Sequence, residues 1–478
     1  MSAVGAAAGS IARPVQAAPP MAARTRLLLE GPVAPTLLRL AAPNVLVMVL
    51  QATVSTLDAV FVDWLGGDAL AGVSVVFPLV MLMQTMSAGG MGGGVASAVA
   101  RALGAGRRRE ADALVAHALI IALGMGALFT VAALAGGPWL YRAMGGTGGT
   151  LDAALAYSRV IFGGAVAYWL YNTLSAVVRG TGNMALPATV MVANGAIYLA
   201  LAPPLILGWG PLPRLGVAGA AAASVTSFAL GSVVLGVYLA SGRSLVTLSL
   251  ARIRPRWALF RDILRVGAPG SLNTVFTNLT IVLVTALVGP FGAHALAGYG
   301  MGARLEYLQI PLVFGLGAAL VTMVGTNMGA GNLARAQHVA WVGSGLAALV
   351  TGAVGLFGAL FPHVWLGLFS RDAEVLAAGT LYLRTVGPLY GFFGLGLALY
   401  FASQGAGRLG WPLFAGFARL AIAGGGGFIA VRWLGGGLAQ IFLVMAVALF
   451  VFGTVNALAV RFGAWRTAGE RILGRRGG

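Results

Sequence analysis

Twelve apolar runs, each long enough to cross a lipid bilayer, divide most of this 478-residue chain. A membrane-spanning helix needs about 20 mostly apolar residues. The runs lie near residues 37–64, 70–99, 112–135, 153–178, 185–208, 217–241, 263–289, 294–327, 338–361, 377–403, 413–434 and 437–460. Short segments rich in Gly, Pro or Arg separate them, and the run Gly424–Gly427 interrupts the eleventh. The pattern predicts an all-α polytopic membrane protein of 12 transmembrane helices.

The composition supports lipid as the solvent of this chain. Hydrophobic residues make up 59% of it and charged residues only 9%, whereas a soluble protein carries roughly 25% charged residues. The net charge of +18 comes from 30 arginines against 12 acids. Because those arginines gather in short connecting segments, they favour positive cytoplasmic loops over a nucleic-acid surface.

The arginines also predict the orientation of the spans. Segments assigned to the cytoplasm hold 22 of the 30, external segments hold four, and four (Arg159, Arg304, Arg384 and Arg419) lie within spans. Arg179 is counted with the cytoplasmic segments. This bias over short loops places both termini in the cytoplasm of a multi-pass protein of the cell inner membrane.

The second half of the chain repeats the first at an offset of 225 or 226 residues. Five matches keep this register, in the pairs 38–43 and 264–269, 69–72 and 295–298, 104–106 and 329–331, 157–159 and 382–384, and 180–187 and 405–412. Six spans per copy give both halves the same orientation, so a pseudo-two-fold axis along the membrane normal relates two six-helix lobes. Transporters with such repeats bind substrate where the repeats meet and rock to alternate access.

The predicted domains follow from the repeat and the loops. They are a disordered cytoplasmic tail at 1–32, a first lobe at 33–241, a cytoplasmic linker at 242–262, a second lobe at 263–462 and a basic cytoplasmic tail at 463–478. The first residues lack the apolar core of a signal peptide, and Met21 is an alternative start to Met1.

Several motifs, in this order, resemble the multidrug and toxic compound extrusion (MATE) family. They are Ala-Ala-Pro at 41–43, the segment 57–72, Gly-Ala-Gly at 104–106, Arg-Gly-Thr-Gly-Asn at 179–183, Gly-Val-Ala-Gly-Ala-Ala at 216–221, Arg304-Leu-Glu306 with Pro311, and Thr-Asn-Met-Gly-Ala-Gly-Asn at 326–332. The resemblance covers about residues 33–462. It implies a V-shaped, two-lobed bundle that exports cationic or amphipathic compounds in exchange for protons or sodium.

Asp58 is the candidate proton-coupling residue. It lies roughly 12–15 Å inside the external turn at residues 66–68, at 1.5 Å per residue. Asn44, Gln51 and Ser55 fall on the same side of that helix, and such a polar stripe predicts a wall of a water-filled cavity. A carboxyl group there costs ~2.5–3.5 kcal/mol on insertion scales, which indicates a function, although a protonated packing residue is the alternative. The resemblance implies a coupling Asp at this place, fifteen residues after a proline, here Pro43.

Other polar residues complete the candidate sites. The first-lobe candidates for lining a substrate cavity are Gln51, Ser55, Tyr157, Asn194, Tyr198 and Ser224. Many family members carry a second Asp before the fifth-span proline, where this chain has Ala202 and Pro203. Asn194 and Tyr198 lie on that face of the helix and are therefore possible partners of Asp58.

The second-lobe candidates are Asn273, Thr277, Arg304 and Glu306. Arg304 and Glu306 are two apart, so they do not face each other on a helix, and for Glu306 a structural ion pair is as good an interpretation as a transport role. Some family members bind sodium through acids in spans seven and ten. This chain has no acid in either span, which favours protons, with sodium at Asp58 as the alternative.

These features predict a secondary active antiporter that exports lipophilic or cationic drugs or toxic compounds in exchange for protons. A cavity lined by aromatic, Met and neutral polar residues with one acid suits such cations. The alternatives are a sodium-coupled exporter of the family and a lipid-linked sugar flippase of its superfamily. We expect a monomer in contact with membrane lipid, with no cofactor, no metal and no nucleic-acid partner. Cysteine is absent, and the four histidines show no spacing typical of metal ligands. The sequence also shows no nucleophile–base pair of the kind that would indicate an enzyme.

The orientation can be tested by single-cysteine labelling, because the chain has no native cysteine. Cysteine replacing Arg108, Arg254 or Arg475 should react with a membrane-impermeant maleimide only after the cells are opened. Cysteine replacing Thr147 or Pro211 should react in intact cells. External labelling at residue 254 contradicts the orientation.

Overall fold

The computed structural model describes residues 23–209, 213–248 and 255–465, without the side chains of Met48, Val49, Ala52 and Ser55. Met1 and Met21, most of the predicted tails and residues 249–254 of the linker lie outside these ranges. All regular structure in the described residues is helical, as predicted.

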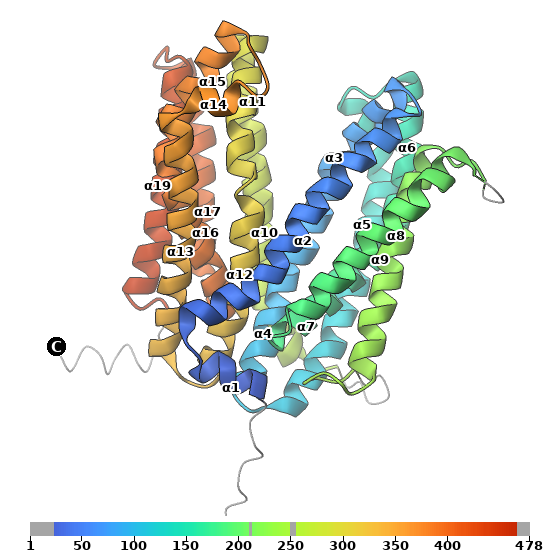
Figure 1. Ribbon diagram of the computed structural model, residues 1–478, viewed down its shortest axis with the longest axis vertical. Helices are drawn as coiled ribbons and strands as arrows, with labels where there is room; N and C mark the ends of the chain where they lie inside the picture. Colours follow the sequence, from blue (N-terminus) through green and yellow to red (C-terminus); the bar gives the residue numbers. More distant parts are fainter. Residues whose placement is uncertain (1–22, 210–212, 249–254, 466–478) are drawn as a thin grey trace, which may run out of the picture.

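The described chain forms two helical lobes, arranged as a V in Figure 1. The first lobe contains α2 (Val33–Asp63), α3 (Gly67–Thr85), η1 (Met86–Met91), α4 (Gly92–Gly104), α5 (Arg108–Ala143), α6 (Gly148–Gly163), α7 (Ala165–Gly180), α8 (Ala185–Leu207) and α9 (Val217–Ala240). The second lobe contains α10 (Trp257–Val288), η2 (Gly289–Phe291), α11 (Ala293–Tyr307), α12 (Ile310–Gly329), α13 (Leu333–Leu360), α14 (Pro362–Leu366), α15 (Ala373–Val386), η3 (Gly387–Leu389), α16 (Tyr390–Ala406), α17 (Gly410–Leu420), η4 (Ala421–Gly426), α18 (Gly427–Arg432) and α19 (Leu438–Arg461).

Several of these helices join end to end into spans. Within the described residues, ten helical segments are long and apolar enough to cross a membrane, and the pair α6–α7, bent by 45°, makes an eleventh. The first predicted span corresponds to α2, which contains a shorter apolar stretch at Val33–Val47. Each of the twelve predicted runs therefore coincides with a helix or with helices joined end to end.

The predicted disorder of 1–32 is wrong for Ala23–Glu30, which forms the helix α1. Leu28 is buried, and its carbonyl accepts a hydrogen bond from Asn327 Nδ2 at 3.2 Å. Arg335 donates to the carbonyl of Gly31. The second lobe supplies both donors, and these contacts hold α1 against that lobe. The composition of the tail alone does not reveal them. The predicted linker is also too long, since α10 already begins at Trp257.

The lobes meet at one end through α4 and α12, whose backbones touch. A Cβ on Gly104 would lie 2.0 Å from the carbonyl oxygen of Thr326, and a Cβ on Gly329 would lie 2.0 Å from that of Arg101. Gly104 and Gly329 are matched positions of the sequence repeat. The contact is thus pseudo-symmetric and leaves no room for any side chain.

Polar contacts join the same end of the lobes. Ser97 on α4 donates to the carbonyl of Gln404 on α16 at 2.6 Å. Arg101 on α4 forms an ion pair with Asp262 on α10, with 2.9 Å between nitrogen and oxygen. At the opposite end the lobes diverge (Figure 1).

The glycine contact predicts an asymmetric response to small substitutions. Gly329→Ala should destabilise the protein by about 1–3 kcal/mol, because the added methyl group overlaps a backbone carbonyl that cannot rotate away. Gly345→Ala in α13 is the matched control, since its Cβ would meet no atom within 4 Å. Thermal unfolding of the purified protein in detergent measures both. Equal melting temperatures for the two variants would contradict the contact.

Candidate functional site

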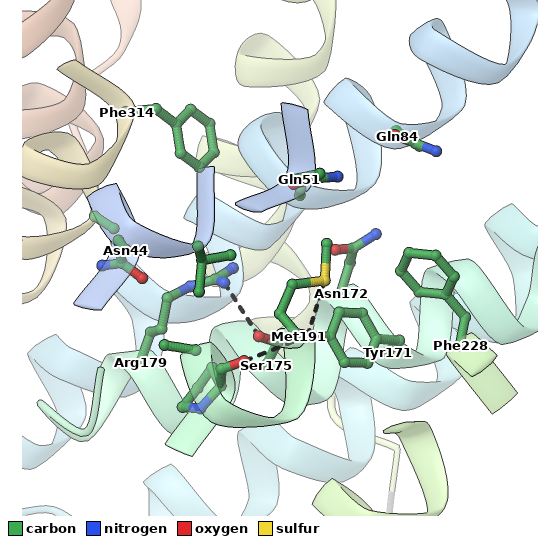
Figure 2. A pocket seen from close by; sticks show the side chains of 15 residues that line it. Asn44, Gln51, Gln84, Tyr171, Asn172, Ser175, Arg179, Met191, Phe228 and Phe314 are labelled. Carbon is green, nitrogen blue, oxygen red and sulfur yellow. Dashed lines mark hydrogen bonds between the residues drawn. The ribbon is translucent and has the colours of Figure 1, made fainter. Parts of the chain in front are cut away.

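A cavity of about 680 Å³ lies between the lobes, on the open side of the α4–α12 contact. Helices α2, α3, α7, α8 and α9 of the first lobe and α12 of the second supply its walls. Figure 2 labels ten of the side chains that line it: Asn44, Gln51, Gln84, Tyr171, Asn172, Ser175, Arg179, Met191, Phe228 and Phe314. Amide, aromatic and thioether groups therefore dominate the surface, as predicted for amphipathic compounds.

Arg179 gives this cavity a positive charge. It was counted with the cytoplasmic segments; in the structure it belongs to the last turn of α7 and lines the cavity. Its guanidinium donates to Ser175 Oγ at 3.1 Å, and its carbonyl accepts from Thr322 Oγ1 of α12 at 3.0 Å (Figure 2 shows the side chain). No acidic side chain is among the described residues that line this cavity. The prediction of one acid in its wall is therefore not met here.

The polar stripe of α2 divides between two surroundings. Asn44 and Gln51 line the cavity between the lobes. Asp58, about two turns after Gln51, is half-buried and accepts a hydrogen bond from the Tyr198 hydroxyl of α8. The Ser55 side chain lies outside the described residues. The predicted pairing of Asp58 with Tyr198 is thus present.

Asn194, the other predicted partner, turns toward α9 instead. With its amide oriented to satisfy both polar atoms, its nitrogen donates to the carbonyls of Ser227 and Val190 at 3.0 and 3.2 Å. The side chain is almost fully buried, so these carbonyls hold it away from Asp58. The helical phase of α8 alone could not show that Tyr198 contacts Asp58 and that Asn194 does not.

Tyr157 and Ser224 belong to the buried surroundings of Asp58 and do not line the cavity. Tyr157 is buried and lies close enough to Asp58 and Tyr168 to interact electrostatically. Ser224 Oγ is hydrogen-bonded to the Tyr168 hydroxyl. Among the described residues no basic side chain forms an ion pair with Asp58. Asp58 therefore lies in a cluster of hydroxyl groups, without a fixed counter-charge.

A second cavity, of about 850 Å³, lies inside the second lobe. Three of the four second-lobe candidates line it: Asn273, Thr277 and Glu306. Glu306 is buried and accepts a hydrogen bond from the Tyr382 hydroxyl at 3.1 Å. Arg304 does not belong to this site, because it is exposed, with its guanidinium carbon 5.5 Å from the ring centre of Phe369. Arg419 lines the cavity instead. Its position within an apolar span was the one feature of the sequence that could have indicated a functional role.

Comparison with known proteins decides the family. The MatE family model matches residues 43–203 and 269–424, one segment in each lobe. The chain belongs to the MatE family. It is therefore a multi-pass membrane transporter of the multidrug and toxic compound extrusion type and not an enzyme, as predicted.

Individual MatE relatives match over most of their length. A probable multidrug resistance protein, NorM, of Thermotoga maritima is 26% identical over 435 residues, covering 90% of this chain and 92% of the relative. An FAD transporter of Shewanella oneidensis is 26% identical over 380 residues, covering 79% and 82%.

Solved MATE structures confirm the fold. A crystal structure of MATE in the bent conformation gives a TM-score of 0.85 at 26% identity, covering 93% of this chain and 98% of that one. An outward-facing MATE transporter of the MOP superfamily gives 0.82 with the same identity and coverage. The two-lobed fold of this MatE protein is therefore that of the family.

The Asp58–Tyr198 hydrogen bond can be tested by a double-mutant cycle. Tyr198→Phe should lower the melting temperature less in an Asp58→Ala background than in the wild type, because contacting residues act non-additively. Tyr238→Phe in α9 is the matched control, since that hydroxyl contacts Asn183 and not Asp58. Thermal unfolding of the purified variants in detergent supplies the measurement. Additive losses would show that the two side chains act separately.

Proposed function

We propose that this MatE protein is an antiporter that exports amphipathic compounds, neutral or with one cationic group, in exchange for protons. The observation that carries the proposal is Asp58, a carboxyl group within a span that hydroxyl groups surround and no described basic residue neutralises. Such a group can take up and release a proton without breaking an ion pair. Ionisable residues within membrane spans mark proton and ion pathways in transporters.

The lining of the cavity between the lobes supports the substrate class. Tyr171, Phe228 and Phe314 offer aromatic faces, Met191 a polarisable surface, and the amides hydrogen-bonding groups. Arg179 disfavours compounds with several positive charges at this position, so the class is narrower than cations in general. Relatives include proteins described as multidrug export proteins, for example MepA of Staphylococcus saprophyticus.

The orientation predicted from arginines supports export. Arg107 in the turn before α5 and Arg335 in the first turn of α13 were both assigned to the cytoplasm, and these helix starts lie at the end where the lobes join. In that orientation the lobes diverge toward the outside, where an exporter releases its substrate. The likeness to an outward-facing MATE structure agrees with this arrangement.

Arg179 also favours a second candidate, an anionic substrate. A guanidinium that lines a cavity suits a carboxylate or phosphate group, and one relative is described as an FAD transporter. The two candidates differ in the sign of the substrate charge, so a panel that includes lipophilic cations, neutral dyes and FAD separates them.

The decisive experiment compares Asp58→Asn with the wild type in an efflux-deficient bacterium. Asn keeps the size of the side chain and most of its hydrogen bonds but fixes the neutral state, so drug resistance and proton-driven efflux should be lost at normal protein amount. Substrate binding should also lose its dependence on pH, because Asn at this position does not titrate. Asp63→Asn, at the exposed end of the same helix, is the matched control and should retain activity.

The coupling ion can be identified by removing the proton gradient and the sodium gradient one at a time and measuring efflux. Collapsing the pH gradient should stop efflux by the wild type, whereas replacing sodium by potassium should not. Loss of transport on removal of sodium alone contradicts proton coupling. Wild-type transport and pH dependence in Asp58→Asn would make Asp58 a packing residue and direct the search to Glu306.

A further inference from the structure

The cavity inside the second lobe contains a guanidinium that the protein leaves without an acceptor. Arg419 on α17 is 9% exposed and lines the cavity. Its guanidinium carbon lies 5.7 Å and 5.6 Å from the ring centres of Phe393 and Phe452. Within the part of the chain that the structure describes, no hydrogen bond or ion pair within 4 Å joins Arg419 to a protein oxygen. A buried arginine has five N–H donors, and leaving them unpaired is costly.

The opposite charge in the same cavity is held apart from Arg419. Glu306 on α11 interacts electrostatically with Arg419 but makes no ion pair with it within the 4 Å limit, and its carboxylate accepts from Tyr382 instead. Tyr382 in turn accepts from the Tyr390 hydroxyl at 3.4 Å. This hydrogen-bonded chain holds Glu306 on its own side of the cavity. The two charges therefore face a shared space without neutralising each other by contact.

The space between them is large and walled by rings. Its empty space, part of which is open to solvent, is about 850 Å³, and Tyr299, Tyr307, Phe393 and Phe452 line it. The buried Oδ1 atom of Asn273, which also lines the cavity, has no partner in the described protein. A positive charge at Arg419 disfavours a lone metal cation. The lining fits an organic molecule with an aromatic body, one negative group and one positive group.

We propose that this second-lobe cavity binds a small aromatic zwitterion, with its carboxylate at Arg419 and its ammonium group at Glu306. Arginine pairs with carboxylates through two parallel hydrogen bonds, and its two flanking rings hold the guanidinium in place for this. The ring of the ligand packs against the tyrosines. This site is separate from the cavity between the lobes, and it does not depend on Asp58 or on the coupling ion.

The test measures binding to the purified full-length protein in detergent by calorimetry, with no ion gradient. Three probes of one shape separate the charges: para-aminomethylbenzoate carries both, para-toluate only the carboxylate, and benzylammonium only the positive charge. The wild type should bind the zwitterion at least about tenfold more tightly than benzylammonium, because a charge-assisted hydrogen bond contributes more than the ~1.4 kcal/mol of a tenfold change. Equal affinities for the three probes, or no saturable binding, would overturn the proposal.

Two variants assign the binding to the cavity. Arg419→Met should weaken binding of both carboxylates about tenfold or more, and Glu306→Gln should remove the preference for the zwitterion over para-toluate. Arg384→Met, at an exposed arginine of α15, is the matched control and should bind as the wild type does. Unchanged affinity in Arg419→Met overturns the assignment. If that variant does not fold, the Glu306→Gln result and the wild-type comparison still decide.

The between-lobe cavity is the alternative location for the probe, because Arg179 lines it. Arg179→Gln should leave binding of para-aminomethylbenzoate unchanged. If binding is lost in Arg179→Gln and kept in Arg419→Met, the probe binds between the lobes and the second-lobe site is wrong. Failure of proton-coupled efflux in the Asp58 experiment would affect neither result.

Discussion

The architecture depends on the direct contact between α4 and α12. Two glycines, Gly104 and Gly329, let the backbones of the lobes touch, because a backbone carbonyl of the other helix lies where a Cβ of each would need to be. The contact closes one end of the V, so the cavity between the lobes has a floor there. Thr322 of α12 donates to the carbonyl of Arg179 from across this seam, which ties the charged cavity residue to the same junction.

Three sites inside this largely apolar protein contain charged side chains, and each accommodates the buried charge in a different way. Arg101 and Asp262 neutralise each other across the lobes. Asp58 has hydroxyl neighbours and, among the residues that the structure describes, no counter-ion. Arg419 has aromatic rings, with an acid nearby but not in contact. A charge within a membrane protein is costly unless paired or solvated, so the last two sites are where protons or ligands have the most to contribute.

The sequence alone predicted the fold well because lipid imposes long apolar runs, and the repeat added the two lobes. The family resemblance, together with helical phase within the fifth span, also predicted Tyr198 as one of two possible partners of Asp58. Helical phase failed where the neighbouring helix decides: Asn194 faces one carbonyl of α9 and one of its own helix, and Arg304 faces outward. Arg179 and Arg419, for which phase was not used, line cavities. Periodicity gives the side of a helix on which a residue lies, but not which element packs there. The α1 helix was missed for the same reason, since its ordering contacts come from the other end of the sequence.

The short helix α1 affects how the two lobes move relative to each other. Leu28 of α1 reaches Gly182 of the first lobe, while its carbonyl is held by Asn327 of the second. Alternating access requires this end of the lobes to separate, and α1 must then leave one lobe or the other. Its contacts therefore stabilise the state in which this end is closed, and they affect both the equilibrium between the two states and the rate of exchange between them. Sequence changes in the amino-terminal segment are a means of setting the transport rate while the cavities stay as they are.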